Sequence, residues 1–170
     1  RPYAPEITKV IQDLSAQGTS VDHPLLRQNE DPKVVGVVVL ASDRGLAGAY
    51  NASVIRAAER EVQAARSEGR EYRLVCIGKK SSSHFRLRGY TIDAEFEGIS
   101  DTPVYSNARE VAGKVAAMFL SEGVERIMLA YTEFVSLGTQ KPRVRRFLPL
   151  QPSEAIAAVG DAQARAGFEF

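Results

Sequence analysis

Cysteine, histidine and tryptophan are scarce in this sequence, and their scarcity excludes several kinds of site. The 170 residues include one cysteine, two histidines and no tryptophan. A single cysteine, Cys76, rules out an intrachain disulfide, so the composition does not point to an oxidising compartment. One cysteine and two distant histidines also make a poor set of zinc ligands. Because Cys76 lies within the apolar run YRLVCIG, we interpret it as a buried structural thiol.

Long hydrophobic runs and an excess of either charge are also missing. The longest apolar run, residues 34–41, is far shorter than the roughly 20 residues that span a bilayer. Lys and Arg number 22 against 21 Asp and Glu, which gives a net charge of +1. The charge balance therefore offers no argument for nucleic acid or an anionic membrane surface as a partner. We expect no nucleic-acid partner and no direct insertion into a bilayer, and no signal-peptide pattern is visible.

The hydrophobic content of 44% suits one sizeable core. Apolar periodicity alternates between strand-like and helix-like segments, which is typical of α/β proteins. We expect strands at residues 34–40, 71–77, 91–96, 124–134 and 143–150, and helices from Asn51 to about 67, at 79–88 and at 105–120. Right-handed crossovers would make most of these strands parallel. The sequence thus predicts an α/β fold, a Rossmann-like three-layer sandwich with a mostly parallel sheet and a terminal hairpin or edge strand.

The stretch VVGVVVLASDRGLAGAYN, from Val34 to Asn51, carries the most information. Its β-branched run predicts a strand buried on both faces, and a tight turn and a helix start follow. Polar side chains then stand at the carboxyl end of the strand, where open α/β sheets place binding groups. The residues of interest are Ser42, Asp43, Arg44, Gly45, Leu46, Gly48 and Asn51. We interpret this segment as a structural loop in which Asp43 accepts backbone N–H bonds at the turn, Arg44 bonds a nearby carbonyl or carboxylate, and Asn51 is the helix N-cap.

Catalytic and ligand-binding interpretations of the same loop are weaker. Neither G-x-G-x-x-G nor a P-loop is present, and no lysine within the turn could neutralise a phosphate. Asp43 lacks the further carboxylates or hydroxyls that a magnesium site needs. His23 and His84 have no triad-like context, and the alternating carboxylates of 93–97 are typical of a solvated face. We therefore expect no active site, no metal and no cofactor.

Two basic clusters remain, Lys79, Lys80, Arg86 and Arg88 in one, and Lys141, Arg143, Arg145 and Arg146 in the other. Arg143 and Arg145 would face one side of a strand and could meet acidic groups of a protein partner. Ordinary solvation of these side chains stays open as the alternative.

The decamer SDRGLAGAYN resembles the S/T-D-R-G-L-C/A-G-x-x-N signature of the gamma subunit of F-type ATP synthases. Further along, YTEFVSLGTQKPRVRRFLPL resembles that family's later strand, hairpin and Leu-Pro-Leu ending. RPYAPEITKVIQDL and DHPLL resemble the end of its first long helix and the linker after it, in an actinobacterial style. The similarity covers nearly all of the chain, and the combination of motifs in the right order makes it specific.

This resemblance implies a domain division and a function. Residues 1–18 would end an N-terminal long helix, 19–33 a linker, 34–150 the globular α/β domain, and 151–170 an irregular tail leading to a C-terminal helix. The long helices themselves would lie largely outside this sequence, which would be the middle domain of a longer subunit. In the family that subunit is a noncatalytic rotor, which couples proton flow through the membrane c ring to ATP synthesis in the catalytic hexamer.

The resemblance also implies partners and a location. The globular domain would be the foot of the rotor, with the epsilon subunit against it and the c ring beneath it. The alpha and beta subunits would be met mainly by the long helices. Phe168, Glu169 and Phe170 would lie near the ring loops, or would instead cap the core of this domain. The subunit would be peripheral to the cytoplasmic face of the bacterial cell membrane. A small nucleotide-binding or phosphoryl-transfer α/β domain is the alternative function.

Overall fold

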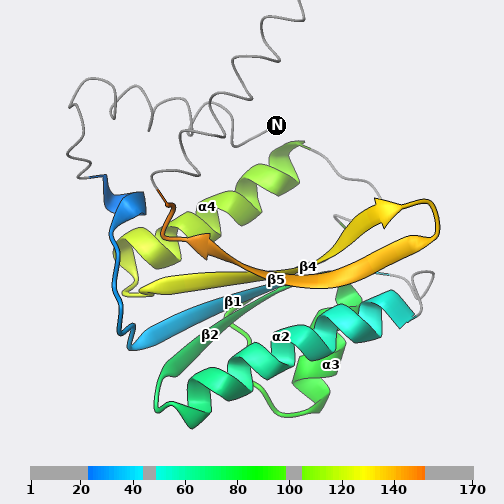
Figure 1. Cartoon of the computed structure of the whole chain (residues 1–170), viewed down its shortest axis with the longest axis horizontal. Helices are drawn as coiled ribbons and strands as arrows, with labels where there is room; N and C mark the ends of the chain where they lie inside the picture. The colour runs from blue at the N-terminus through cyan, green and yellow to red at the C-terminus, as the bar shows by residue number, and fades with distance from the viewer. Residues whose placement is uncertain (1–22, 44–48, 99–104, 152–170) are drawn as a thin grey trace, which may run out of the picture.

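The computed structural model describes residues 23–43, 49–98 and 105–151 of the chain. Within them the secondary structure alternates between strands and helices (Figure 1). The elements are the 3-10 helix η1 (Pro24–Leu26), β1 (Val34–Leu40), α2 (Ala49–Ser67), β2 (Glu71–Ile77), α3 (Lys79–Leu87), β3 (Ala94–Phe96), α4 (Tyr105–Ser121), β4 (Arg126–Ser136) and β5 (Thr139–Leu148).

The five strands form one sheet in the order β3-β2-β1-β4-β5. All neighbouring pairs are parallel except β4 and β5, which form an antiparallel hairpin at the edge. Helices α2 and α3 cover one face of the sheet and α4 covers the other (Figure 1). The predicted α/β fold, a three-layer sandwich with a mostly parallel sheet and a terminal hairpin, is confirmed.

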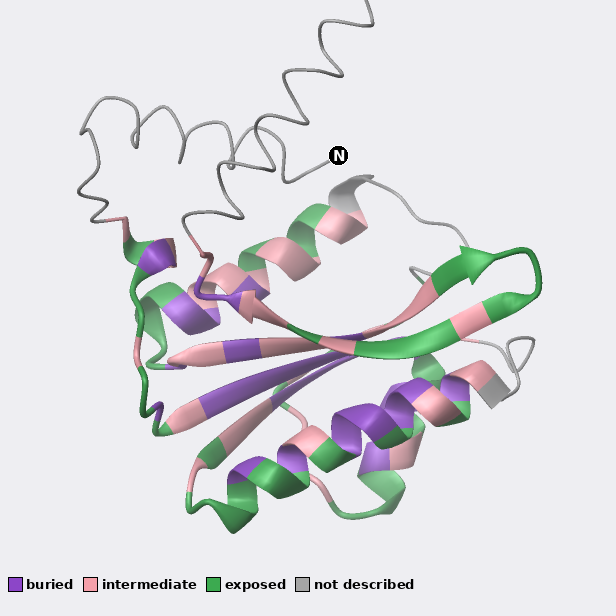
Figure 2. Ribbon diagram, viewed as in Figure 1, coloured by how far each residue is buried: buried purple, intermediate pink, exposed green. Residues whose placement is uncertain are grey.

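Strand β1 lies at the centre of the core, as its unbroken apolar sequence predicts. Residues 35–39 are all buried (Figure 2). Val37 and Val39 point toward α2, where they pack with Val54, whereas Val38 points toward α4. Each such side chain contributes roughly 1.5–3 kcal/mol by leaving water, so the two faces of β1 hold the layers together. Cys76 is also buried, as expected, and burial raises the pKa of its thiol to about 12.

Several element boundaries differ from the sequence prediction, including those of α2, β3 and β5. Helix α2 begins at Ala49, so Asn51 lies inside its first turn and is not the N-cap. Strand β3 is only three residues long. Strand β5 begins at Thr139, four residues before the predicted start, because it is an exposed edge strand whose polar residues and Pro142 weaken the usual pattern. Among the described helices, none combines the length and the apolar character that crossing a bilayer requires.

Candidate functional site at the carboxyl ends of the strands

Ser42 and Asn51 form a reciprocal pair that joins the end of β1 to the start of α2. The Ser42 N–H donates to Asn51 Oδ1 at 3.0 Å, and Asn51 Nδ2 donates to Ser42 Oγ at 2.6 Å. Asn51 is only 8% exposed, so its amide is held in one orientation. The side chain that we predicted to cap the helix instead closes the loop between strand and helix.

Asp43 connects the ends of three parallel strands. Its Oδ1 accepts the Lys79 N–H at 2.9 Å, and its Oδ2 accepts the Gly98 N–H at 2.9 Å. Lys79 begins α3 directly after β2, and Gly98 follows β3. Asp43 accepts backbone N–H bonds, and its two donors within the described residues belong to neighbouring segments. Both carboxylate oxygens are thereby committed to the backbone.

Close backbone packing accompanies these bonds at Gly78. This residue has a φ of +96°, and a Cβ placed there would lie 1.9 Å from the Ala41 carbonyl oxygen. The Lys80 N–H donates to the Ser42 carbonyl oxygen at 3.1 Å, and the Ala41 N–H donates to that of Ile77 at 2.9 Å. Only glycine combines this φ with such a close approach. The described part of the loop is therefore a closely packed backbone junction between the ends of β1 and β2.

An apolar groove opens beside this junction, between the sheet and α4. The connections from β1 and into β4 run on opposite faces, so the groove lies at the switch point where α/β sheets commonly bind ligands. Its volume is about 520 Å³. Its lining is mainly apolar and includes Val38, Leu40, Val111, Val115, Leu129 and Phe147. Because none of its described lining residues is Lys or Arg, the described part of the groove suits apolar side chains better than a phosphate.

A second polar cluster joins α2 to α3 on the opposite face of the sheet. Glu59 is 7% exposed, and its Oε1 lies 3.1 Å from His84 Nε2. Its Oε2 accepts from Arg88 Nε at 2.7 Å and from the Tyr90 hydroxyl at 2.8 Å. Burial raises the pKa of Glu59, but the hydrogen bonds from His84, Tyr90 and Arg88 outweigh it and lower the pKa to about 2. The carboxylate is fully engaged in holding α3 in place.

Sequence reasoning missed this cluster because Glu59 looks like one of several charges on the polar side of a helix. The available signal was its spacing. Glu59 comes four residues after the buried Ile55 and three before the buried Val62, which places it beside the apolar stripe of α2.

The two predicted interface arginines have different surroundings. Arg143 Nε donates to Glu133 Oε2 at 2.6 Å across the β4-β5 hairpin. Arg145 instead lines an open hollow of about 430 Å³ together with Arg126 and Arg146. Both predicted side chains are exposed. Both arginines stay candidate partner contacts, and one of them, Arg143, is already paired within the hairpin.

Comparison with known proteins identifies the family. A family model described as ATP synthase matches residues 1–170. The chain belongs to the ATP synthase family. Its relatives in that family include the ATP synthase gamma chain of Rhodococcus jostii, 37% identical over 166 residues that cover 89% of this chain and 51% of the relative. The gamma chain of Frankia casuarinae is 40% identical over 158 residues, covering 91% and 53%.

A solved structure shares the fold of this ATP synthase family member. It is a chain of the Tetrahymena thermophila mitochondrial ATP synthase, from a structure of the central stalk and c ring. The TM-score is 0.60 at 21% identity, and the match covers 85% of this chain and 66% of that one. At this identity the likeness supports the fold alone. The chain spans about half the length of the curated gamma chains that it matches.

The loop that resembles the gamma-subunit signature lies partly within the described residues. Ser42, Asp43 and Asn51 are described, and all three join separate backbone segments. The remaining predicted site residues, Arg44, Gly45, Leu46, Gly48, Phe168, Glu169 and Phe170, lie outside the described residues. Within residues 23–43, 49–98 and 105–151, no cluster of three or more His, Cys, Asp or Glu side chains could hold a metal ion.

Proposed function

We propose that this chain is the central part of the gamma subunit of a proton-translocating F-type ATP synthase, where it acts as a noncatalytic rotor domain. Its α/β domain is the foot of the central stalk. It turns with a shaft of two long helices and couples proton flow through the c ring to ATP synthesis in the catalytic hexamer. The family match and the gamma-chain relatives support this assignment.

One structural observation carries the mechanical part of the proposal. The Leu150 N–H donates to the Leu25 carbonyl oxygen at 2.7 Å, and Gln28 Nε2 donates to the Leu150 carbonyl oxygen at 3.2 Å. The described chain therefore enters and leaves the α/β domain at one place (Figure 1). Helices that extend from two adjacent attachment points would lie side by side, as a two-helix shaft requires.

The chemistry of the described site supports a structural role over nucleotide binding. The Asp43 carboxylate oxygens accept backbone N–H groups. The groove at the switch point has an apolar lining. A nucleotide-binding domain would need cations or a run of free N–H groups there. Calorimetry with ATP or ADP and magnesium separates the two functions, because the rotor domain predicts no saturable heat.

The partners follow from the same proposal. The domain contacts the epsilon subunit and the c ring, while the alpha and beta subunits meet mainly the shaft. The subunit is peripheral to the cytoplasmic face of the bacterial membrane. Arg143, Arg145 and residues 168–170 remain candidate contacts. The hairpin adds Phe134 and Leu137, which are 73% and 105% exposed and form an apolar tip that suits a protein partner.

Titration of purified epsilon subunit into this chain tests the assignment. We expect binding in the micromolar range or tighter. Phe134→Ser combined with Leu137→Ser should weaken it by about tenfold if the hairpin tip contributes. Leu87→Ser is the matched control, because Leu87 is 89% exposed on α3, away from the hairpin. A folded chain that shows no binding to epsilon would contradict the proposed contact with that subunit.

A further inference from the structure

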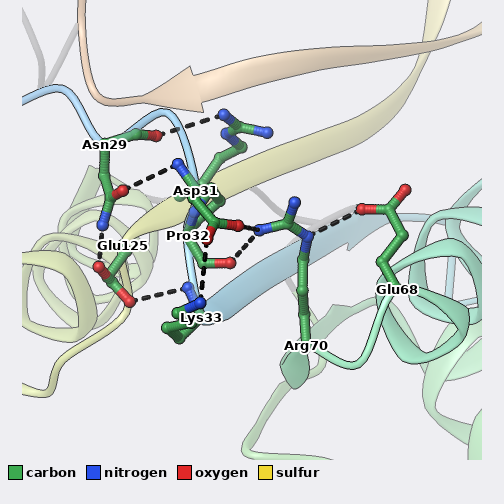
Figure 3. A network of polar contacts seen from close by, with 8 residues as sticks. Asn29, Asp31, Pro32, Lys33, Glu68, Arg70 and Glu125 are labelled. Atoms are coloured by element: carbon green, nitrogen blue, oxygen red, sulfur yellow. Dashed lines mark hydrogen bonds and ion pairs between the residues drawn. The ribbon is translucent and has the colours of Figure 1, made fainter.

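The segment that leads into β1 is fastened across the amino-terminal ends of the strands (Figure 3). We call residues 28–33 the entry strap. The Lys33 carbonyl oxygen accepts the Glu71 N–H at the start of β2, at 2.9 Å. The Val34 carbonyl oxygen accepts the Glu125 N–H just before β4, also at 2.9 Å. The strap thus ends between the two strands that flank β1.

Glu125 holds the strap from the β4 side. Its Oε1 accepts the Lys33 N–H at 2.9 Å, and its Oε2 accepts a hydrogen bond from Asn29 Nδ2. Asn29 in turn uses its Oδ1 to accept the Asp31 N–H at 3.0 Å. The Asn29 carbonyl oxygen accepts from Arg126 Nη2 at 3.4 Å. The Glu125 carboxylate therefore accepts hydrogen bonds from residues near both ends of the strap, Asn29 and Lys33.

Arg70 holds the strap from the β2 side. Its Nη1 donates to the Pro32 carbonyl oxygen and, at 3.2 Å, to Asp31 Oδ1. Its Nε donates to Glu68 Oε2 at 2.8 Å, directly after α2. The side chain is only 19% exposed. In Figure 3 the guanidinium of Arg70 lies between the strap and Glu68, so it links the strap to the turn that joins α2 to β2.

The strap also leads to the point where the chain leaves the domain. Gln28, its first residue, donates to the Leu150 carbonyl oxygen, and Leu25 just before it accepts the Leu150 N–H. The entry point is therefore connected to the sheet through the strap, and the exit point, just after β5, is hydrogen-bonded to the same part of the chain.

We propose that Arg70 and Glu125 are positioning residues that make the entry strap a stiff mechanical link, through which rotation of the shaft turns the α/β domain. This inference rests on the proposed rotor function. Six residues of unfastened chain can extend to about 20 Å and rotate freely about their backbone dihedrals. A shaft joined to the α/β domain by such a segment would rotate through some angle before the domain rotated with it. The fastened strap passes the torque directly into β2 and β4.

The test uses a complete ATP synthase that contains the full-length gamma chain with this sequence, in membrane vesicles. Two rates are measured, ATP hydrolysis and ATP-driven proton pumping, and their ratio reports coupling. Arg70→Gln combined with Glu125→Ala removes the charged contact on each side of the strap, because alanine has no acceptor for Lys33 or Asn29. Arg70→Lys keeps the charge at position 70. Arg73→Gln is the matched control, because it breaks an equally charged network with Asp93 and Glu122 away from the strap.

We expect the double variant to assemble and to hydrolyse ATP. The number of protons pumped per ATP should fall by about twofold or more. The reason is that losing hydrogen bonds to charged groups raises the population of the state with a released strap at least tenfold. Arg70→Lys should keep part of the ratio of proton pumping to ATP hydrolysis that the double variant loses. Arg73→Gln should leave this ratio unchanged, although its melting temperature falls by about as much as that of the double variant. A double variant that pumps as well as Arg73→Gln would overturn the proposal. Failure of the unmodified chain to assemble or pump would instead refute the rotor function itself.

Discussion

The buried carboxylate of Glu59 gives a sharp prediction about stability and pH. Its ordinary pKa is 4.5, and its contacts lower the pKa to about 2 in the folded protein. A carboxyl whose pKa is lowered by folding stabilises the fold above its ordinary pKa, and this stability disappears as the pH falls toward the lowered value. The contribution is therefore complete at pH 7 and fades between about pH 4.5 and 2.

The magnitude follows from the two values. The difference between 4.5 and about 2 corresponds to about 3 kcal/mol, and the side chain is only 9% exposed, so water weakens it little. Glu59→Gln leaves His84, Arg88 and Tyr90 facing a neutral amide. We expect this variant to lose about 3 kcal/mol in the free energy of unfolding at pH 7. The loss should shrink steadily as the pH falls below 4.5, because the carboxyl of the unfolded chain then takes up a proton while that of the folded chain stays ionised until about pH 2.

Urea unfolding followed by circular dichroism measures the free energy of unfolding of each variant at a series of pH values. Glu61→Gln is the control, since Glu61 lies on the same helix outside the network. Other carboxyls titrate equally in all three proteins and cancel from the differences. The reasoning fails if Glu59→Gln is as stable as the unmodified chain at pH 7, or if the gap between them stays constant as the pH falls.

Three further predictions concern the junction and the core. Gly78→Ala should destabilise the protein by about 3 kcal/mol or more. Gly69→Ala is the control and should destabilise it by only about 1 kcal/mol, because Gly69 has a φ of +75° but a Cβ there would meet nothing within 4 Å. Thermal melts compare the two variants. Asp43→Ala should lower the free energy of unfolding by about 1–3 kcal/mol and should speed hydrogen exchange of the Lys79 and Gly98 amides. An Asp43→Asn variant keeps one acceptor and should show a smaller effect. Equal exchange in all three proteins would refute the role of Asp43. Cys76 should stay unmodified by thiol reagents until urea unfolds the chain, because it is fully buried and burial raises its pKa to about 12; rapid labelling of the folded protein would contradict this burial.

The parts of the fold that depend on local pattern were predictable from the sequence. The β-branched run of β1 and the apolar stripe of α2 indicate their structure and burial without help from distant residues. Strand β5 was placed less well, since an edge strand with an exposed face needs no regular apolar alternation.

The contacts of the site could not be predicted, because their partners are remote in sequence. Asp43 meets backbone groups 36 and 55 residues away, and Glu59 meets side chains 25 to 31 residues away. A single sequence shows which residues are polar but not which segments the sheet order brings together. The position of Asn51 shows the same limit: a residue suited to capping a helix was used to close a loop.

The central claim is that the α/β domain turns with the shaft, and single-molecule rotation tests it most directly. Leu87→Cys provides an attachment point on α3, because Leu87 is 89% exposed while the native Cys76 is fully buried. A bead bound there, on full-length gamma chain within an immobilised catalytic hexamer, should rotate stepwise in one direction when ATP is added. A bead that only fluctuates while the same complexes hydrolyse ATP would contradict the account.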